Sequence, residues 1–367
     1  MTDHGTCTVP WLEPLAGALV RDGHAALVVV ATTQGSAPRE PGVAMVVTAS
    51  ACTGSIGGGH LEYEALRIAR DALASQAPPC TWIVRFPLAA RLGQCCGGVA
   101  TLAFSTVDRH ARTWLEPAIA CARTGAPFAL VTGIADGAHE SDARLLVTAD
   151  DARGTLGTGV LDSAAVALAR TRLAGAAQGA ALVRFAHDDQ ATLLVQVERP
   201  DPFPILLFGN GHVGRALADV LGVVPAQVRW IDSRAADFPQ RVPHNVEIVV
   251  CDAPEDELRH APTGAFVVVT THSHALDLTL IETALARDDW RYVGLIGSKS
   301  KRAQFERRLA ARGQPVEAFA RVRCPIGAHG VAITGKHPGA IAIAIAAELL
   351  VVREASARLP ALRMASR

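Results

Sequence analysis

The order of apolar and polar positions predicts different structures in the two halves of the chain. In the first half, a strand pattern, a glycine-rich loop and an amphipathic helix pattern follow one another over residues 45–73, and the same succession returns over residues 145–173. The two segments align without a gap at an offset of 100 residues and share Val-Thr-Ala, three glycines and an Ala-Arg pair. We therefore predict that the first half contains a duplicated α/β module.

The similarity between the two copies continues beyond the helices. IVRF at residues 83–86 corresponds to LVRF at 182–185, and ATLAF at 100–104 corresponds to ATLLV at 191–195. Between these matching strands the first copy is longer, and its extra segment contains GQCCGG at residues 93–98. We expect the first copy to bind a ligand and the second to support it; a longer surface hairpin without a ligand is the alternative.

The second half has buried strands that alternate with helical stretches, beyond a proline-rich linker expected at Val197–Pro204. The strands are ILLF, QVRWID, EIVVC, FVVVTT and YVGLIG. Such alternation predicts a doubly wound parallel sheet. The predicted fold class is therefore α/β, with an N-terminal duplicated α/β module followed by a C-terminal Rossmann-like doubly wound parallel sheet. We expect domains at residues 1–110 for the first copy, 111–199 for the degenerate second copy and 200–367 for the Rossmann-like part.

Composition narrows the class of partner. The chain has 367 residues, half of them hydrophobic, and a formal net charge of zero, which excludes the broad basic surface of a nucleic-acid binder. The opening residues lack the pattern of a signal peptide, and the apolar run Ile341–Val352 contains Glu348 and is too short to span a bilayer. We expect a cytoplasmic protein, without membrane or nucleic-acid binding, whose eight irregularly spaced cysteines are reduced.

A glycine motif follows the first strand of the second half. Gly209, Gly211 and Gly214 form G-x-G-x-x-G between a strand and a helix, and Asp232 closes the next strand about twenty residues later. The glycines allow the backbone to approach a pyrophosphate at the helix N-terminus, and Asp232 is a candidate acceptor for a ribose hydroxyl. NAD(P) or another nucleotide is the expected ligand; an empty scaffold turn is the alternative.

Histidines follow the fourth strand, at the edge where open α/β sheets bind ligands. The segment THSHALD contains His272, His274 and Asp277, and alternate residues of an extended segment point to the same side. The two imidazoles are candidates for metal binding, although two histidines and one carboxylate lack a fourth ligand. Loop histidines that bond to the backbone are the alternative.

Basic residues follow the fifth strand in GLIGSKSKRAQF. Ser298 opens a predicted helix, and Lys299 and Lys301 lie in its first turn, where cations would reinforce an anion site formed by the helix N-terminus. We expect a phosphate-bearing ligand here; a solvated basic helix face is the alternative.

The first copy of the module has three candidate loops. GSIGGGHLE is a glycine nest suited to an oxyanion, and nearby QGSAPREPG is either part of the same site or an ordinary turn. GQCCGG adds two neighbouring thiols as soft ligands or nucleophiles, without the spacing of a redox CxxC or an iron–sulfur site. The candidate residues are Gly57, Gly58 and Gly59 in the first loop, Gln34, Ser36 and Arg39 in the second, and Gln94, Cys95 and Cys96 in the third.

Together these motifs resemble those of the XdhC/CoxI family, the accessory proteins of xanthine dehydrogenase and related molybdenum hydroxylases. The resemblance extends from about Leu27 to Leu350, and the second copy is its least matched part. The motifs that carry it are GSAPREPG, GSIGGGHLE, GQCCGG, LLFGNGHVGRALA, WIDSR, THSHALDL, YVGLIGSKSKRAQF and CPIG. The chain departs from the family at THSH, where Ser273 replaces the acidic residue of T-H-D-H, and this argues against a metal site in that loop.

The resemblance implies a carrier of the molybdenum cofactor (molybdopterin) rather than an enzyme. Such a protein binds the finished cofactor, protects it while a terminal oxo ligand is exchanged for sulfur, and delivers it to apo-xanthine dehydrogenase, an enzyme of purine catabolism. A homodimer and a cysteine desulfurase are the further expected partners. The cofactor phosphate suits the glycine nests at Gly57–Gly59 and Gly297–Lys301, and its thiophilic molybdenum suits the thiolate of Cys95 or Cys96.

Two other functions stay open. An NAD(P)-dependent oxidoreductase would use GNGHVG and Asp232, with His272 or His274 as general acid or base. It leaves GQCCGG without a role, because hydride transfer does not need adjacent thiols. A purely structural assembly factor would retain no cofactor and would tolerate replacement of its cysteines.

Overall fold

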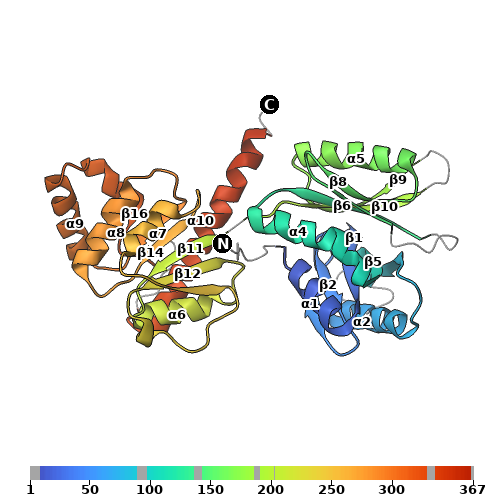
Figure 1. Ribbon diagram of the computed structural model, residues 1–367, viewed down its shortest axis with the longest axis horizontal. Helices are drawn as coiled ribbons and strands as arrows, with labels where there is room; N and C mark the ends of the chain where they lie inside the picture. Colours follow the sequence, from blue (N-terminus) through green and yellow to red (C-terminus); the bar gives the residue numbers. More distant parts are fainter. Residues whose placement is uncertain are drawn as a thin grey trace. The chain divides into compact units, whose positions relative to one another are not determined.

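The computed structural model describes residues 9–88, 97–135, 143–185, 191–201, 203–328 and 335–364. These residues form two compact units, one within residues 9–201 and one within residues 203–364, and each is described by itself (Figure 1). Within the described ranges, no helix is both long and apolar enough to cross a membrane.

Two antiparallel five-stranded sheets make up the first unit. Their strand orders are β3-β2-β1-β5-β4 and β8-β7-β6-β10-β9, so each strand of one sheet has a counterpart at the same place in the other. This equivalence confirms the predicted duplication. The first sheet and its helices are α1 (Leu12–Asp22), β1 (His24–Gln34), β2 (Ala44–Val47), β3 (Cys52–Gly54), α2 (Gly59–Ala74), β4 (Thr81–Pro87) and β5 (Val99–Asp108). The second comprises α4 (Arg112–Thr124), β6 (Phe128–Gly133), β7 (Arg144–Val147), β8 (Ala152–Thr155), α5 (Gly159–Ala174), β9 (Gly179–Arg184) and β10 (Thr192–Glu198), with the short helix η1 (Arg109–Ala111) before it.

Each sheet is covered on both faces, and this explains the unbroken apolar run of β1. Successive side chains of a strand point to opposite faces. Ala26, Val28 and Val30 therefore pack with α2 on the outer face, whereas Leu27 and Val29 pack on the inner face. That inner core is shared: it contains side chains of both sheets together with α1 and α4. Helix α5 covers the outer face of the second sheet as α2 covers that of the first (Figure 1).

The second unit contains a six-stranded parallel sheet in the order β13-β12-β11-β14-β15-β16. Helices α6 and α10 pack on one face, and α7, α8 and α9 pack on the other, as in a doubly wound Rossmann sheet. The strands are β11 (Pro204–Phe208), β12 (Gln227–Asp232), β13 (Val246–Val250), β14 (Phe266–Val269), β15 (Tyr292–Leu295) and β16 (Val322–Arg323). The helices are α6 (His212–Leu221), η2 (Ala235–Asp237), α7 (Pro254–His260), α8 (His274–Leu285), α9 (Lys299–Ala311), η3 (Val316–Arg321) and α10 (Pro338–Met364).

The connection between the units is shorter than the linker expected at Val197–Pro204. Strand β10 continues to Glu198, and β11 already begins at Pro204. Proline is tolerated as the first residue of a strand because its missing N–H is not required there. The segment between the two sheets therefore covers only residues 199–203, fewer than the sequence suggested.

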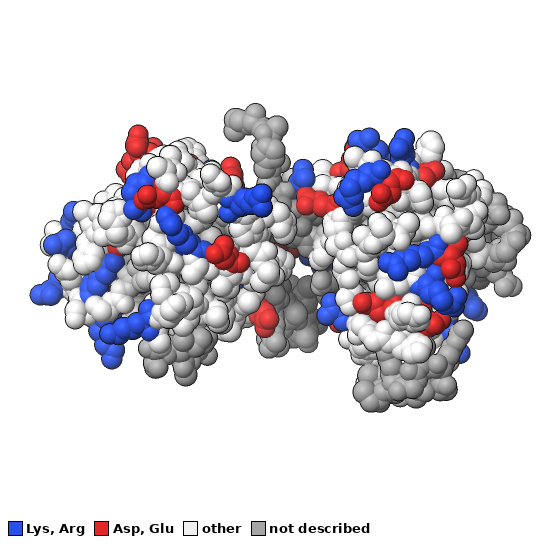
Figure 2. All heavy atoms as spheres, turned by 90° about the horizontal axis from the view of Figure 1, so that it is seen from below, with Lys and Arg blue, Asp and Glu red and all other residues white. Residues whose placement is uncertain are grey.

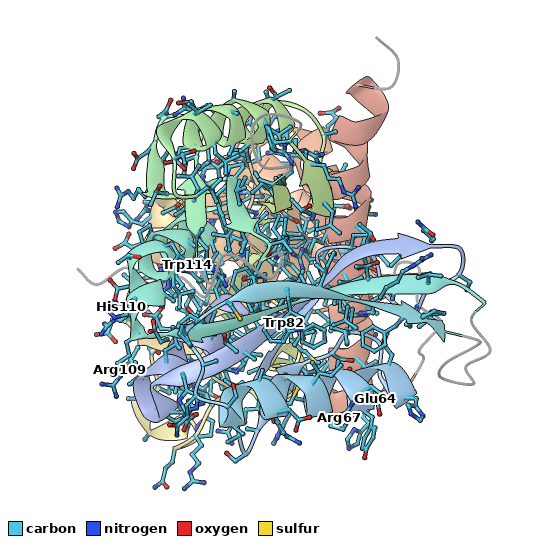
Figure 3. All side chains as sticks on the ribbon, turned by 90° about the vertical axis from the view of Figure 1, so that its right-hand side faces the viewer. Glu64, Arg67, Trp82, Arg109, His110 and Trp114 are labelled. Carbon is cyan, nitrogen blue, oxygen red and sulfur yellow. The ribbon has the colours of Figure 1, made fainter. Side chains whose placement is uncertain are left out.

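Charged side chains of both signs are interspersed on the molecular surface. On the face shown in Figure 2, Lys and Arg side chains lie among Asp and Glu side chains on both units. On α2, for example, Arg67 lies between Glu64 and Asp71, at 3.1 and 3.0 Å, and Glu64 and Arg67 project from the outer side of the helix (Figure 3). This distribution agrees with the formal net charge of zero.

Candidate functional site

Three of the loops singled out in the first copy meet at one end of the first sheet. Gln34, the last residue of β1, pairs with Val99, the first residue of β5, and Val99 also pairs with Pro87, the last residue of β4. The loop that follows β1 and the loop that joins β4 to β5 therefore start from the same edge.

The contacts of two glycines show how closely these loops approach. A Cβ at Gly98, in GQCCGG, would lie 2.3 Å from the carbonyl oxygen of Ser36 and 2.5 Å from that of Gln34. A Cβ at Gly57, in GSIGGGHLE, would lie 2.6 Å from the Cβ of Pro38. The QGSAPREPG loop thus contacts both of the other motifs, and only glycine fits at these two contacts.

The glycine nest already contains one carboxylate. Glu62, in the first turn of α2, accepts hydrogen bonds from the backbone N–H of Ile56 (3.0 Å) and Gly58 (3.1 Å) and from the Ser55 hydroxyl (2.6 Å). The Gly57 N–H donates to Ser55 Oγ at 3.2 Å. These bonds hold the loop in shape and use the amides of Ile56, Gly57 and Gly58 internally.

The second copy repeats this carboxylate but differs at the start of its helix. Asp162, 100 positions after Glu62, accepts from the Leu156 N–H at 2.6 Å. There the side chain of Thr158 caps α5 by accepting from the Leu161 N–H at 3.3 Å. The corresponding N-cap of α2 is Gly58, which has no side chain that could cap the helix. Copy one therefore lacks the side-chain N-cap that copy two has, and the carboxylate of Glu62 bonds to the amides just before the helix in copy one.

Gln94, Cys95 and Cys96 of the GQCCGG motif lie outside the described residues. The described residues on either side of them are Leu88 and Gly97, and the Leu88 N–H donates to the carbonyl oxygen of Gly98 at 3.0 Å. Arg39 is exposed on the adjacent loop, and its Cγ would lie 3.3 Å from a Cβ at Gly57. The described residues on both sides of the cysteine motif thus belong to the edge where the other two loops meet.

The glycine motif of the second unit has the geometry of a nucleotide turn. A Cβ at Gly209 would lie 2.7 Å from the carbonyl group of Thr270, and one at Gly214 would lie 2.1 Å from the carbonyl oxygen of Gly209. A Cβ at Gly211, in contrast, would meet no heavy atom within 4 Å. Gly209 and Gly214 are required for packing, whereas Gly211 leaves space in front of α6.

Asp232 has partners that the sequence did not suggest. Its Oδ2 accepts from the Asn210 N–H at 2.8 Å, and its two oxygens accept from Nε and Nη2 of Arg234, each at 2.9 Å. Burial raises the pKa of Asp232, but the bonds from Arg234 and Asn210 outweigh burial and hold the pKa below its usual range. A ribose hydroxyl could bond to this carboxylate only after displacing one of these donors.

Lys301 belongs to an internal ion pair rather than to an exposed cationic surface. Its Nζ lies 2.5 Å from Oδ2 of Asp277, which is fully buried, and 2.9 Å from the Ile296 carbonyl oxygen. The Thr271 hydroxyl donates to the other oxygen of Asp277 at 2.6 Å. The ammonium group joins the first turn of α8 to the loop after β15, so it is not available to an anion in this arrangement.

The other residues predicted at this edge are exposed. Ser298 caps α9 by accepting from the Lys301 N–H at 3.2 Å, and Lys299 is exposed beside it. His272 and His274 are also exposed. Ser273, between them, caps α8, which begins at His274, so the expectation of an extended THSHALD segment with both imidazoles on the same side is wrong. Within the described ranges, no group of three or more His, Cys, Asp or Glu side chains is arranged to hold a metal ion.

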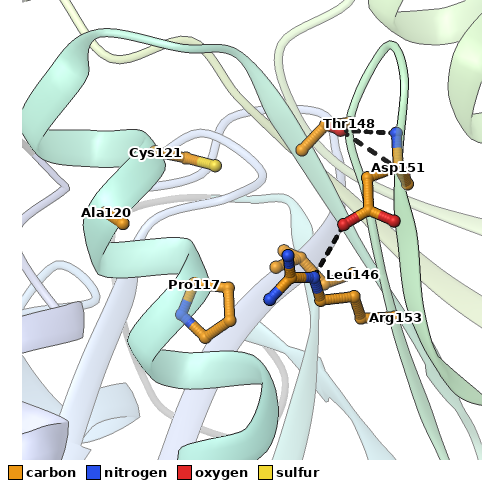
Figure 4. Close-up of a pocket in the computed structure, with 7 residues that line it drawn as sticks. All are labelled: Pro117, Ala120, Cys121, Leu146, Thr148, Asp151 and Arg153. Carbon is orange, nitrogen blue, oxygen red and sulfur yellow. Dashed lines mark hydrogen bonds and ion pairs between the residues drawn. The ribbon is translucent and has the colours of Figure 1, made fainter.

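A separate pocket of about 220 Å³ lies between α4 and the β7–β8 hairpin (Figure 4). Its lining includes Cys121 and an ion pair of 2.7 Å between Arg153 and Asp151. Burial raises the pKa of the Cys121 thiol, and the nearby Arg153 lowers it only in part. Motif analysis did not find this pocket, because its residues come from the second copy, where no motif was recognised.

Sequence reasoning also missed the structural roles of Glu62 and Arg234. Both had visible signals: an acidic residue stands seven positions after Ser55 in copy one and after Thr155 in copy two, and Arg234 follows Asp232 in WIDSR. The sequence showed that these residues were present but not which groups they would bond to.

Comparison with known proteins identifies the family. The XdhC and CoxI family matches residues 18–87, and the XdhC Rossmann domain matches residues 205–349. A crystal structure from Bacillus halodurans described as a xanthine dehydrogenase has the same fold, with a TM-score of 0.70 and 19% identity over 95% of this chain and 96% of that one. The uncharacterized protein YqeB of Escherichia coli (strain K12) is 30% identical over 156 residues, 41% of this chain and 27% of YqeB, so the chain spans about a quarter of that relative's length. One family match covers strands β1 to β4 with the QGSAPREPG and GSIGGGHLE loops, and a second match covers the parallel sheet of the second unit, so the chain belongs to the XdhC and CoxI family.

Proposed function

We propose that the protein is an accessory carrier that binds the molybdenum cofactor, protects it during sulfuration and inserts it into xanthine dehydrogenase or a related molybdenum hydroxylase. The cofactor is cargo in this proposal, and the protein is not an enzyme. The observation that carries the proposal is that the QGSAPREPG loop contacts Gly57 of GSIGGGHLE and Gly98 of GQCCGG at one end of the first sheet. The sequence of the second copy has no GQCCGG.

The phosphate of the cofactor suits the N-terminus of α2. The first N–H groups of a helix lack intrahelical partners, and the helix dipole favours an anion at this end. In copy two a threonine side chain bonds to one of these groups, whereas Gly58 replaces it in copy one and has open space around it. The exposed guanidinium of Arg39, on the loop that packs against Gly57, adds a cation at the same edge.

The molybdenum of the cofactor suits a cysteine thiolate, because thiolates are soft ligands. Cys95 and Cys96 are the candidates; Leu88 and Gly97, the described residues on either side of them, lie at the end of the sheet where Pro38 packs against Gly57. Gln94 precedes them in the same loop. A ligand with a phosphate at one end and a metal at the other would use both kinds of group at once.

The partners follow from this function. A carrier that shields labile cargo must release it on contact with apo-xanthine dehydrogenase, and a cysteine desulfurase would supply the sulfur. We further propose a homodimer in the cytoplasm, because two copies would cover the cargo better than one. We keep the domain division into residues 1–110, 111–199 and 200–367 as part of this proposal. Residues 1–110, the first copy, would bind the cofactor.

The test is equilibrium binding of isolated molybdenum cofactor to the full-length protein, with the metal measured in the retained fraction. Wild type should retain molybdenum, and Cys95→Ala or Cys96→Ala should retain at least tenfold less of the metal. Cys52→Ala is the matched control, because Cys52 is an exposed free cysteine on β3 of the same sheet. Arg39→Met should weaken binding, whereas Arg67→Met, on the outer side of α2, should not.

Either of two results would remove the proposal. If wild type retains no molybdenum while it remains folded, the protein is not a carrier. If both cysteine variants retain as much metal as Cys52→Ala does, the GQCCGG loop does not bind it. Reduction of a nicotinamide nucleotide in proportion to a consumed substrate would instead favour the NAD(P)-dependent oxidoreductase.

A further inference from the structure

Two guanidinium groups flank the glycine turn of the second unit. Arg215, in the first turn of α6, donates from Nε to Asn210 Oδ1 at 3.1 Å and from Nη2 to the Asp237 carbonyl oxygen at 2.5 Å. Arg234, two residues after β12, contacts the carboxylates of Asp232 and Asp237, each at 2.9 Å. Both arginines therefore lie beside the carboxyl ends of β11 and β12, where this type of sheet binds the adenosine half of a dinucleotide.

The turn also contains a donor without a partner. Asn210 is 2% exposed, and its side-chain Nδ2 makes no hydrogen bond within the described part of the chain. The amide cannot simply be reversed, because Arg215 Nε is a donor and fixes the oxygen on its side. An unsatisfied buried donor is unfavourable, and a ligand that brings an acceptor to the turn would remove this cost.

The partners of Asp232 decide which ligand fits. A carboxylate at this position ordinarily accepts a bond from the ribose 2′-hydroxyl of NAD, whereas an arginine accommodates the 2′-phosphate of NADP. Oδ1 of Asp232 accepts from the backbone N–H and Nε of Arg234, and Oδ2 accepts from Arg234 Nη2 and the Asn210 N–H, so an unmodified ribose finds no free acceptor there. Asp232, with 8% of its side chain exposed, instead acts as a positioning residue that holds the guanidinium of Arg234 at the site.

The outer edge of Arg234 can exchange its partner for a phosphate. Its contact with Asp237 joins two side chains that are 39% and 43% exposed, and ion pairs at such exposure contribute little. A 2′-phosphate would replace the Asp237 carboxylate and gain a charge-assisted bond from a guanidinium already held in place. Arg215 supplies a second cation on the same side of the turn.

We propose that this turn is a binding site for a dinucleotide with a 2′-phosphate on its adenosine ribose, that is, NADP(H) rather than NAD(H). The pyrophosphate would lie in front of Gly211 at the uncapped N-terminus of α6, and the 2′-phosphate would contact Arg234. This site is separate from the carrier function proposed above and does not involve the cysteine loop.

The test is a titration of the full-length protein with NADPH and with NADH, in which the fluorescence of the reduced nicotinamide reports binding. The affinities of 2′,5′-ADP and 5′-AMP are measured by their displacement of NADPH. Wild type should bind NADPH and 2′,5′-ADP at least tenfold more tightly than NADH and 5′-AMP. Arg234→Leu should lose this preference and gain affinity for NADH, because removal of the guanidinium frees the oxygens of Asp232. Arg308→Leu, which changes an exposed arginine on α9, is the matched control and should leave both affinities unchanged.

Three results would overturn the inference. Wild type could bind NADH as tightly as NADPH, it could bind neither nucleotide while its near-ultraviolet circular dichroism shows a folded protein, or Arg234→Leu could keep the wild-type preference. None of these results bears on retention of molybdenum, which tests the carrier function alone.

Discussion

The indole rings of Trp11 and Trp114 lie with their centroids 6.3 Å apart and tilted by 46° to each other, in the core shared by the two sheets of the first unit. Each ring begins a Trp-Leu-Glu-Pro sequence, at residues 11–14 and 114–117. The helices that contain these sequences end at equivalent left-handed glycines, Gly23 and Gly125. The duplication therefore extends to α1 and α4, and the two copies meet through corresponding residues.

Replacement of either tryptophan should destabilise the first unit strongly. Trp11 and Trp114 are each 4% exposed, so truncation to alanine should cost about 3–5 kcal/mol through lost burial and a residual cavity. Because the rings contact each other, the effects of Trp11→Ala and Trp114→Ala should not add in the double variant. Urea unfolding of the three variants measures this coupling. Strict additivity would show that the two helices are stabilised independently.

The Trp-Leu-Glu-Pro repeat also shows what the sequence could and could not predict. A gapless offset of 100 residues correctly aligned β2, β3 and α2 with β7, β8 and α5, because each copy needs the same apolar positions to build them. The tryptophan motifs are offset by 103 residues instead, so a gapless comparison passes over them. A search that allowed a short insertion before β2 would have found α1 and α4 as a further pair.

Partners of charged residues were harder to predict than the elements that contain them. The sequence correctly placed Lys301 at the start of α9, but it treated the segment that contains Asp277 as extended, whereas Asp277 lies in the first turn of α8; it suggested ligand binding for both residues. Their ion pair joins residues 24 positions apart in different helices. Helix periodicity and glycine motifs report local conformation, whereas such a pair depends on how two loops approach each other in the folded sheet.

Glu198 should make the stability of the first unit depend on pH. Burial raises the pKa of this carboxyl to about 7 from an ordinary 4.5, and the hydrogen bond from Trp11 Nε1, at 3.4 Å, offsets burial only in part. Below pH 4.5 both folded and unfolded chains hold the proton. Between pH 4.5 and 7 only the folded chain holds it, so stability falls as pH rises through this window and then levels off.

The variant Glu198→Gln should lack this fall. Relative to wild type, it should gain about 1–3 kcal/mol of unfolding free energy between pH 4.5 and pH 8. Urea unfolding of both proteins at several pH values gives this difference directly. Glu116→Gln is the control, because Glu116 is 62% exposed and should give a nearly constant difference. A constant difference for Glu198→Gln as well would mean that its carboxyl titrates normally in the folded protein.

The ion pair of Lys301 and Asp277 should be costly to break from either side. Lys301→Met leaves a fully buried carboxylate unpaired, and Asp277→Leu leaves a buried ammonium group unpaired, so each should destabilise the second unit by about 3–5 kcal/mol. The double variant removes both charges and should be more stable than either single variant. Arg312→Met, which breaks an exposed ion pair with Glu282 next to the same helix, should cost less than about 1 kcal/mol. A double variant as unstable as the sum of the singles would show that the charges do not interact.

The glycines of the nucleotide turn should separate folding from binding. A Cβ at Gly214 would lie 2.1 Å from the carbonyl oxygen of Gly209, so Gly214→Ala must move α6 away from β11 and should cost at least about 1–3 kcal/mol. Gly211 has a φ of −85°, which alanine adopts readily, and open space around it. The free energy of unfolding of Gly211→Ala should therefore lie within about 0.5 kcal/mol of that of wild type.

The same methyl group at residue 211 would occupy the space that a pyrophosphate needs. Gly211→Ala should accordingly lower the affinity for NADPH at least tenfold while the stability of the protein stays normal. Gly214→Ala should lower the stability, and its affinity for NADPH should fall as a consequence. Urea unfolding and nucleotide titration of both variants distinguish the two effects. If Gly211→Ala binds NADPH as wild type does, the phosphates do not pass in front of α6, and the space beside Gly211 has no part in nucleotide binding.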